Sequence, residues 1–474
     1  MLPETRQFDA ALHVVAALRA AGHQAYLAGG CVRDLLLGRE PKDYDVATSA
    51  TPDLVLNLFP RTFAVGAHFG VVLVADGDED GYVTTEVATF RSDGAYSDGR
   101  HPDAVRYTAS AEEDVRRRDF TINGLLLDPD KMLGREVDEG THPGHKDKHG
   151  SRVGHPAVID HVGGLADLDA GVVRAIGQPG ERFEEDHLRM MRGVRFAARF
   201  GFELDAGTAT AMRRLAAKTA AVSRERVRDE LTKMLTEGQA RRAFELLDAT
   251  GLLKEVLPEI ARMKGVEQPP QYHPEGDVWV HTLGLLDQLE AGCPLTLAWG
   301  ALLHDVGKPS TFRRAPDRIR FDGHVEKGVE MSRAILTRLR FSRDDAAQVE
   351  SLVAHHMHFK DVGRMKESTL KRLMRLPRFD EHLELHRLDC LASSGHLENY
   401  DLVKRKFEEM SAADEIKPAP LITGADLIAA GFRPGPRFGE ILSAVEDAQL
   451  EHRLRTPAEA LEWVLSQWPL ESGG

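Results

Sequence analysis

The chain contains 474 residues, carries a formal net charge of −14, and is 42% hydrophobic and 29% charged. Because one hydrophobic core rarely extends over such a length, we expect about two to four domains. The composition is typical of a soluble globular protein, and no uninterrupted apolar stretch approaches the length that crosses a bilayer. The amino-terminal segment lacks the apolar centre of a signal peptide, and the three cysteines lie far apart. We therefore expect a cytoplasmic protein with reduced thiols and no membrane partner.

The acidic balance argues against a nucleic-acid partner only if the charges are spread evenly. Arginines cluster instead at residues 116–118, 189–199 and 224–228. Because binding of nucleic acid follows the local potential of a patch, the net charge implies only that such a site would be local.

Residues 1–136 have the pattern of an α/β fold. An amphipathic helix at the amino terminus is followed by a short apolar strand, a Gly-Gly turn and a second helix through residues 35–37. The predicted strands, rich in apolar or β-branched residues, are 24–28, 44–48, 70–75 and 82–91. From Glu181 onward, apolar residues recur at helical spacing to the end of the chain. The pattern therefore predicts an α/β head followed by an all-helical body.

Two segments have the composition of loops. Residues 92–103 are rich in Gly, Ser and Asp, and residues 138–156 are dense in Gly, His and Lys. The histidines of the second segment suggest a metal site, but they have no regular spacing and no thiolates beside them. The composition therefore favours a solvated loop at 138–156.

The first helix after a strand begins at a Gly-Gly turn, Gly29-Gly30, with Arg33 in its first turn. Glycines allow backbone N–H groups to approach a phosphate, and Arg33 could reach the same phosphate as a forked donor. Most turns of this kind merely reverse the chain, so the turn alone is weak support for a phosphate site.

Asp43 and Asp45 follow this turn and strengthen the hypothesis of a phosphate site. If both lie in a strand, residues two apart point to the same face, and two carboxylates side by side need a cation between them. Mg²⁺ suits such a pair because it completes its shell with waters and substrate phosphates. A lone Asp-x-Asp is usually a solvated strand end, whereas behind a Gly-Gly turn it favours metal-dependent phosphoryl transfer.

These residues resemble the signature of the polymerase β-type nucleotidyltransferases. The similarity is closest to the heads of class II tRNA CCA-adding enzymes and bacterial poly(A) polymerases. Further family-like motifs follow in the expected order: Arg117 to Asn123; Asp160, Gly163-Gly164 and Asp167-Leu168; Glu185 to Arg189, running on to Phe196; and Ser223 to Arg226. The resemblance implies addition of CCA to tRNA 3′ ends from CTP and ATP with Mg²⁺. The alternative is a poly(A) polymerase, or an enzyme that adds only CC or only A.

The resemblance also implies roles for single residues. Asp43 and Asp45 would be catalytic and hold Mg²⁺, and Asp186 and Arg189 would select the base. The residues expected to hold the nucleotide phosphates are Gly30, Arg33, Arg118, Arg192 and Arg195. Independently of the family, Asp186, Arg189, Arg192 and Arg195 recur every three residues, so we expect them on one slowly drifting stripe of a helix.

Three further features of the head stay open. Glu86 is a candidate third catalytic carboxylate, although a strand glutamate facing solvent explains it equally well. Residues 92–103 correspond to a flexible element that the family uses in adenosine addition. Residues 138–156 form an insertion relative to the family, whose members usually have a short turn at this position.

A second series of residues resembles the pattern of HD phosphohydrolases. Its core is His281, His304-Asp305 and Asp389, and His324, His355 and His356 fall where metal-rich members add ligands. An imidazole beside a carboxylate can bind a divalent ion that lowers the pKa of a bound water. The resemblance implies a second divalent metal, of unknown identity, and phosphodiesterase or phosphatase activity.

The motifs together predict four domains. They are a nucleotidyltransferase head at 1–170, a neck at 171–265, an HD domain at 266–400 and a helical segment that contacts tRNA at 401–474. A rival hypothesis makes the head an inactive RNA-binding module and the HD domain the only enzyme. The intact Asp43, Asp45 and Arg118 argue against that hypothesis. The sequence leaves the oligomeric state unknown.

Overall fold

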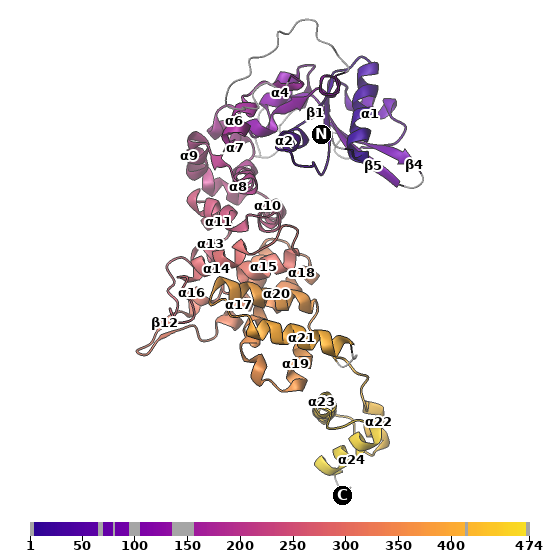
Figure 1. Cartoon of the computed structure of the whole chain (residues 1–474), viewed down its shortest axis with the longest axis vertical. Coiled ribbons are helices and arrows are strands. Elements are labelled where there is room, and N and C mark those ends of the chain that lie inside the picture. The colour runs from indigo at the N-terminus through magenta and orange to yellow at the C-terminus, as the bar shows by residue number, and fades with distance from the viewer. Residues whose placement is uncertain are drawn as a thin grey trace. The chain divides into compact units, whose positions relative to one another are not determined.

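The computed structural model describes residues 4–64, 70–78, 81–93, 105–134, 156–412 and 416–470. The chain divides into two compact units, Met1–Pro258 and Glu259–Gly474 (Figure 1). Almost all of the predicted loops at 92–103 and 138–156 lies outside the described residues. No helix in the described ranges is long and apolar enough to cross a membrane.

A mixed seven-stranded sheet organises the first unit, in the order β3-β4-β5-β2-β1-β8-β9. Its strands are β1 (Ala25–Ala28), β2 (Asp45–Thr48), β3 (Thr62–Phe63), β4 (Val71–Asp78), β5 (Gly81–Thr89), β8 (Leu125–Leu127) and β9 (Val158–Asp160). A separate antiparallel pair joins β6 (Arg91–Asp93) to β7 (Val105–Tyr107). The four strands predicted in the head are confirmed with small shifts at their ends. One shift matters for the site, because β2 begins at Asp45 and leaves Asp43 outside the strand.

Helices surround this sheet and continue beyond it. They are α1 (Arg6–Ala20), α2 (Gly30–Leu36), α3 (Pro52–Leu58), α4 (Ala111–Arg116), α5 (Pro129–Met132), α6 (Gly164–Ala170), α7 (Pro179–Glu185), α8 (Leu188–Phe200), α9 (Ala206–Leu215), α10 (Arg224–Thr236), α11 (Ala240–Ala249) and α12 (Leu253–Val256), with 3₁₀ turns η2 (Thr121–Asn123) and η3 (Ala216–Ala221). Helix α1 is amphipathic, and Thr5 caps it by accepting from the Phe8 N–H. Its buried face includes Phe8, Val14 and Leu18.

Helix α8 is the centre of the helical part of the first unit and packs against α10 and α11. Gly193 brings α8 close to the head, because a Cβ at that position would lie 2.8 Å from the Phe120 ring and 2.6 Å from Met212. The two-residue strands β10 (Val172–Val173) and β11 (Glu203–Leu204) pair beside α8. The expectation of an all-helical body is therefore corrected, because the parallel pair of β10 and β11 lies at its beginning.

The second unit is a helical bundle followed by a smaller helical cluster. Its helices are α13 (Pro258–Ala261), α14 (Val278–Asp287), α15 (Leu295–Leu303), α16 (Lys308–Thr311), α17 (His324–Arg338), α18 (Arg343–His355), α19 (Glu367–Met374), α20 (Phe379–Ala392), α21 (Glu398–Ala412), α22 (Gly424–Ala429), α23 (Arg437–Leu450) and α24 (Pro457–Gln467), with the 3₁₀ turn η4 (His356–Arg364). The hairpin of β12 (Arg313–Arg314) and β13 (Ile319–Arg320) is a further exception to the all-helical prediction.

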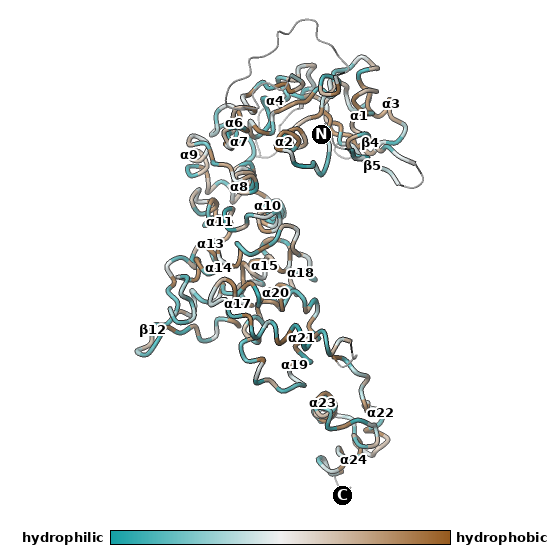
Figure 2. The backbone as a smooth tube through the Cα atoms, viewed as in Figure 1, coloured by the Kyte–Doolittle hydropathy of each residue, from teal (hydrophilic) through white to brown (hydrophobic). Residues whose placement is uncertain are grey.

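Helix α15 is the core of this bundle. It is buried along nearly its whole length and packs against α14, α18 and α20. The more exposed helices alternate hydrophobic and hydrophilic residues (Figure 2). Helices α22, α23 and α24 share a separate core that includes Leu427, Ile441 and Val464. The central position of α15 matters for function because the His304-Asp305 pair follows directly at its end.

Candidate functional site

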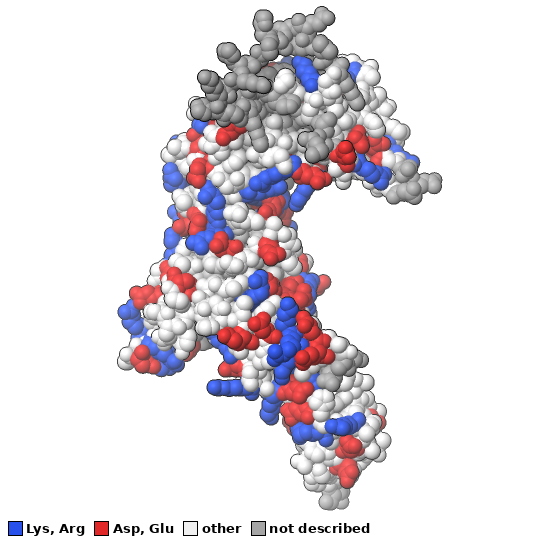
Figure 3. Space-filling model, viewed as in Figure 1, with Lys and Arg blue, Asp and Glu red and all other residues white. Residues whose placement is uncertain are grey.

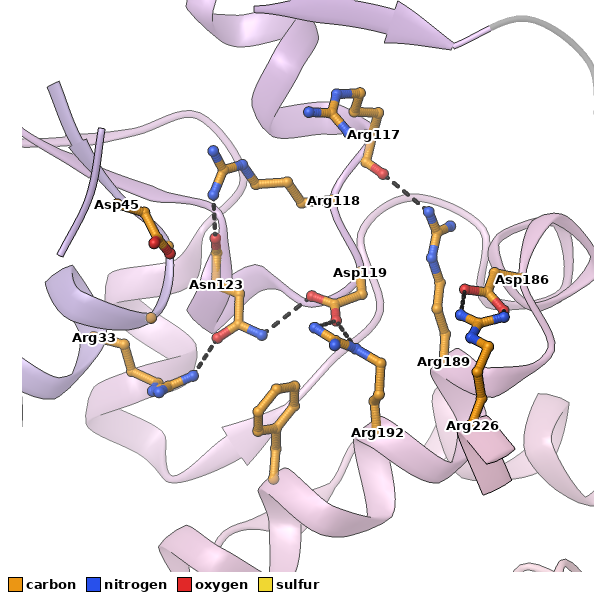
Figure 4. Close-up of a pocket in the computed structure, with 13 residues that line it drawn as sticks. Arg33, Asp45, Arg117, Arg118, Asp119, Asn123, Asp186, Arg189, Arg192 and Arg226 are labelled. Atoms are coloured by element: carbon orange, nitrogen blue, oxygen red, sulfur yellow. Dashed lines mark hydrogen bonds and ion pairs between the residues drawn. The ribbon is translucent and has the colours of Figure 1, made fainter. Parts of the chain in front are cut away.

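A cavity of about 440 Å³ lies in the first unit between the Gly-Gly turn, the segment before η2 and the amino-terminal part of α8 (Figure 4). Its lining residues are Gly29, Gly30, Arg33, Asp45, Arg117, Arg118, Asp119, Asn123, Asp186, Arg189, Arg192, Phe196 and Arg226. Six of these are arginines. On the face shown in Figure 3, basic and acidic side chains are interspersed. The cavity lining differs from that face, because its arginines outnumber its aspartates and make it locally positive. Such a lining suits a polyanion.

The Gly-Gly turn forms one wall of this cavity. Gly29 has φ +74°, a conformation that favours glycine, and its N–H donates to the Leu125 carbonyl at 3.0 Å. A Cβ on Gly29 would lie only 2.9 Å from Nη1 of Arg118. The missing side chain therefore lets the Arg118 guanidinium lie against the turn.

Arg33 is buried at the same wall and is held by several contacts. Its guanidinium donates to Oδ1 of Asn123 at 2.5 Å and to Oδ1 of Asp34 at 2.7 Å. It also lies over the Phe200 ring, 4.5 Å from the centroid. A cation fixed in this way needs little reorganisation to bind an anion in the cavity.

Asn123 and Asp119 connect the two walls. Asn123 donates to Oδ1 of Asp119 at 3.1 Å, and Nε of Arg192 donates to Oδ2 of the same carboxylate at 2.8 Å. Burial alone would raise the pKa of Asp119, but Arg192 and Asn123 outweigh burial and lower it to about 2. Sequence reasoning missed both residues, although both lie in the 117–123 motif from which only Arg118 was chosen.

Carboxylates crowd one end of the cavity. Asp45 opens β2 and lies directly opposite Glu86 in the parallel ladder with β5. Burial, followed by the charge of Glu86, raises the pKa of Asp45 to about 6, although Arg118 opposes the change. Burial and Asp43 likewise raise the pKa of Glu86. The structure thus brings the candidate third carboxylate next to Asp45.

Asp43 contributes to this cluster from a different position than predicted. It is exposed and precedes β2, so the argument that two strand residues share one face does not apply to it. Its charge still acts on both Asp45 and Glu86. Three neighbouring carboxylates, two of them with raised pKa values, fit a divalent cation, which would offset their repulsion.

Asp186 lies toward the opposite side of the cavity from Asp45 (Figure 4). Arg226 donates to both of its carboxylate oxygens, at 2.7 and 3.3 Å. Arg189 donates to Glu185 and to the Arg117 carbonyl at 3.3 Å. Arg226 was quoted in a motif but given no role from the sequence.

The predicted stripe on one helix is wrong in two respects. Helix α7 ends at Glu185 and α8 begins at Leu188, so Asp186 lies between two helices. Arg195 is buried, and its Nε donates to Glu230 on α10 at 2.7 Å instead of lining the cavity. Each three-residue step turns about 60° back around a helix, so Arg195 has drifted away from Arg189. The structure brings Arg189 and Arg192, but not Arg195, to the cavity.

A second cluster lies in the second unit. It joins His281 on α14, His304 and Asp305 after α15, His324 at the start of α17, His356 after α18, and Asp389 on α20. Nε2 of His304 is 3.1 Å from Oδ2 of Asp305, and Nε2 of His281 is 3.1 Å from Oδ1 of Asp389. On the other side of Asp305, its Oδ1 is 3.9 Å from Nε2 of His324 and 3.8 Å from Nε2 of His356.

Each of the four imidazoles in this cluster has its Nδ1 beside an acceptor. The acceptors are Glu275 for His281 (2.7 Å), the Ala301 carbonyl for His304 (2.9 Å), the Phe321 carbonyl for His324 (2.9 Å) and the Val353 carbonyl for His356 (2.7 Å). Because a carbonyl only accepts, the Nδ1 facing it carries a proton, and this contact fixes the ring with Nε2 toward the centre of the cluster.

Two of the four Nε2 atoms make no hydrogen bond within the described residues. Nε2 of His324 and Nε2 of His356 are buried without a hydrogen-bond partner in the part of the chain that the structure describes. Burial lowers the pKa of His324 and lowers that of His356 to about 3, so both rings are neutral. Neutral imidazole nitrogens around a buried carboxylate fit metal ions on both sides of Asp305.

His355 is not part of this cluster, contrary to the prediction. Its Nδ1 lies 2.8 Å from the Ser351 carbonyl, and its ring faces His358 and His382. Successive helical residues point about 100° apart, so His355 and His356 cannot both face the centre.

Glu275 and Lys308 were missed by sequence reasoning. Oε1 of Glu275 lies beside Nδ1 of both His281 and His273, at 2.7 and 2.9 Å. Nζ of Lys308 is 2.6 Å from Oδ2 of Asp305. Lys308 stands three residues after Asp305, so its closeness in sequence was an available signal.

Comparison with known proteins identifies the chain. Three family models match it: "Poly A polymerase head domain" at residues 25–174, "Probable RNA and SrmB- binding site of polymerase A" at 201–264, and "tRNA nucleotidyltransferase domain 2 putative" at 324–464. The CCA-adding enzyme of Streptococcus pneumoniae R6 is 31% identical over 465 residues, covering 97% of this chain and 98% of the relative. The chain belongs to the CCA-adding enzyme family.

Other members of the CCA-adding enzyme family agree with this assignment. The Bacillus pumilus enzyme is 38% identical over 302 residues, covering 63% of this chain and 64% of the relative. The structure of the Bacillus stearothermophilus CCA-adding enzyme in complex with CTP matches with a TM-score of 0.69 and 26% identity over 98% of each chain.

Membership confirms several predictions from the sequence. The chain is a nucleotidyltransferase of the class II CCA-adding family, with a polymerase head and a largely helical remainder. Enzymes of this family use divalent metal ions. The division of the helical remainder into a neck, an HD domain and a tRNA-contacting segment stays a prediction.

The carboxylate crowding predicts a stability change in metal-free protein. The folded state raises the pKa of Asp45 from 3.8 to about 6, so its stabilising contribution is complete below the unfolded value and is lost as pH rises through 6. We expect Asp45→Asn to raise the free energy of unfolding near neutral pH in EDTA by about 1–3 kcal/mol. The gain should disappear in acid, where wild-type Asp45 is also neutral. Thermal unfolding at several pH values measures this, and a destabilised Asp45→Asn protein at neutral pH contradicts the proposed crowding.

Proposed function

We propose that this chain adds cytidine, cytidine and adenosine to tRNA 3′ ends from CTP and ATP without a nucleic-acid template. The observation that carries the proposal is the cavity of the first unit, which has carboxylates at one end, arginines along its walls, and an acceptor (Asp186) and a donor (Arg189) at the other end. Solved CCA-adding enzymes that share the fold are complexes with CTP, with ATP and with tRNA.

The carboxylate end suits the reacting phosphate. Asp43 and Asp45 would hold Mg²⁺, with Glu86 beside Asp45 as a further ligand or as a source of negative charge. Bound Mg²⁺ would supply activation of the attacking 3′ hydroxyl and stabilisation of the leaving pyrophosphate. Because the folded chain raises the pKa of Asp45, its carboxylate is partly protonated in mild acid, and metal binding should weaken there.

The arginine walls suit the triphosphate. Arg33, Arg118 and Arg192 offer forked guanidinium donors that match phosphate oxygens. Arg33 and Arg192 are joined through Asn123 and Asp119, so both cations are held in place before the nucleotide arrives. The Gly29-Gly30 turn leaves the backbone accessible beside them.

The far end of the cavity suits selection of the base. Cytosine and adenine both carry an exocyclic amino donor, whereas uracil and guanine carry a carbonyl acceptor at the corresponding edge. Asp186 only accepts hydrogen bonds, so it favours the two amino-bearing bases, and Arg189 supplies donors for their ring nitrogens. The Arg226–Asp186 and Glu185–Arg189 contacts keep the pair fixed without a template strand.

The metal-binding role predicts loss of nucleotide incorporation. We expect Asp43→Ala and Asp45→Ala each to lower incorporation of labelled CTP into tRNA lacking CCA by about a thousandfold, since several kcal/mol of charge stabilisation are lost. Asp53→Ala, at an exposed acidic residue on α3, is the matched control.

Product length with CTP and ATP together separates the alternative activities. Three added nucleotides support the proposal, whereas long adenosine tails, or only CC or only A, contradict it.

The base-selecting role predicts a change of specificity. Asn at position 186 can donate as well as accept, so we expect Asp186→Asn to raise the rate of UTP incorporation relative to CTP by about tenfold. Asp229→Asn, at an exposed acidic residue of α10, should leave the ratio unchanged. Competition between labelled UTP and CTP measures the ratio. An unchanged ratio in an Asp186→Asn protein that still incorporates CTP would remove Asp186 from base selection.

We propose a second activity, hydrolysis of phosphate esters, for the histidine cluster of the second unit. The specific observation is the pair of buried Nε2 atoms of His324 and His356 beside Asp305, for which the described part of the chain supplies no hydrogen-bond partner. His281, His304, Asp305 and Asp389 would hold one divalent ion, and Asp305, His324 and His356 a second. Bound metal would lower the pKa of a water for attack on phosphorus. Glu275 fixes the His281 tautomer, and Lys308 orients Asp305.

Neighbouring histidines provide a matched test of this second site. We expect His356→Ala to cost the protein its second metal ion and to lower the hydrolysis of bis(p-nitrophenyl) phosphate by about a hundredfold, because it removes a ligand. His355→Ala, one residue earlier but turned away from the centre, should retain both. CTP incorporation should be unchanged in either variant. Equal effects of the two substitutions on metal content would contradict the ligand assignment.

A further inference from the structure

A glutamine beside the histidine cluster has a buried donor that no described residue satisfies. Gln268 lies in the loop between α13 and α14, and its side chain is 4% exposed. Its Oε1 accepts a hydrogen bond from Nζ of Lys308 at 2.7 Å. Nζ of Lys308 also lies 2.6 Å from Oδ2 of Asp305. The Lys308 ammonium thus links the Gln268 side chain to the Asp305 carboxylate at the centre of the cluster.

The chemistry of Lys308 fixes which way the Gln268 amide points. An ammonium group only donates, so the amide oxygen must face Lys308 and the amide nitrogen must face elsewhere. That nitrogen, Nε2, is buried and has no hydrogen-bond partner among the residues in the described ranges. A buried donor without an acceptor costs free energy, so the arrangement calls for an acceptor that is supplied from outside the chain.

Lys308 offers a second donor at the same place. An ammonium carries three protons, and the acceptors for two of them are oxygens of Asp305 and Gln268. A third N–H can therefore donate to another group. The face of Phe321 lies 5.4 Å from Nζ and helps to hold the side chain. Lys308 therefore places an N–H donor next to the Asp305 carboxylate, which lies between two groups of histidines, and Gln268, in contact with Lys308, adds a buried donor.

We infer that Gln268, together with Lys308, binds a non-bridging oxygen of a phosphate group at this centre. The inference rests on the proposed phosphohydrolase function and names its substrate class: phosphate esters held through a phosphoryl oxygen. A phosphoryl oxygen supplies the acceptor that the amide lacks. It also carries the negative charge that a lysine favours.

An isosteric substitution isolates the donor. Gln268→Glu keeps the size of the side chain and the oxygen that accepts from Lys308, but replaces the donor nitrogen with a second acceptor. Gln268→Met removes both hydrogen-bonding groups. Gln271→Glu adds the same charge at an exposed glutamine three residues later and serves as the control.

The probe is inorganic phosphate, titrated calorimetrically into the full-length metal-loaded protein. Metal content and thermal midpoint are measured on every variant. We expect Gln268→Glu and Gln268→Met to weaken phosphate binding by at least about tenfold, with metal content retained and Gln271→Glu unchanged. The KM for bis(p-nitrophenyl) phosphate should rise in parallel.

Wild-type phosphate affinity in Gln268→Glu would overturn the inference, because it would mean that Gln268 only accepts from Lys308 or that a buried water satisfies its nitrogen. The same conclusion would follow if the wild-type protein bound no phosphate. If phosphate binding depends on Gln268 but the wild-type protein hydrolyses no ester, the hydrolytic function fails while the phosphate site stands.

Discussion

Repulsion between carboxylates is the constraint around which the first unit is built. The parallel pairing of β2 with β5 sets Asp45 opposite Glu86, and Asp43 adds a third negative charge from the preceding turn. A fold that holds these groups together loses stability unless a cation is present, which suits a site that must bind metal and substrate reversibly. The arginines on the other walls supply the opposite charge, so a metal–triphosphate complex complements both halves of the cavity. Charge separation within one cavity also explains how a chain of net charge −14 can act on nucleic acid.

The proposed metal centre of the second unit differs from that of the first in its ligands. Its histidines are held in fixed orientations, because each Nδ1 lies beside a carbonyl or a carboxylate and each Nε2 faces Asp305 or Asp389. The first unit relies on carboxylate oxygens, which suit Mg²⁺, whereas imidazole nitrogens suit transition metals. The two proposed centres therefore need not compete for one ion. Separate substitutions can test them independently.

The sequence was sufficient for the features that depend on local pattern. The Gly29-Gly30 turn and the head strands follow from spacing and residue type, whereas family resemblance indicated most of the residues that line the cavity and all but one of the histidines tried for the second cluster. Features that depend on tertiary packing were not predictable. A three-residue spacing could not show that α8 begins after Asp186, nor that Arg195 turns toward Glu230. Likewise, adjacent histidines look alike in sequence, and only the helix direction separates His356 from His355. Asn123 and Gln268 contact Arg33 and Lys308, which are 90 and 40 residues away, so the sequence did not reveal what these two side chains bind.

The central claim is that the crowded carboxylates and the facing arginines form one site for a metal-bound nucleoside triphosphate. The most direct measurement is a crystal structure of the full-length protein with CTP and Mn²⁺, using anomalous scattering to locate the metal. We predict an anomalous peak at the Asp43 and Asp45 carboxylates, the triphosphate against Arg33, Arg118 and Arg192, and the cytosine amino group on Asp186. A bound nucleotide elsewhere, with the two carboxylates apart and free of metal, would contradict the account.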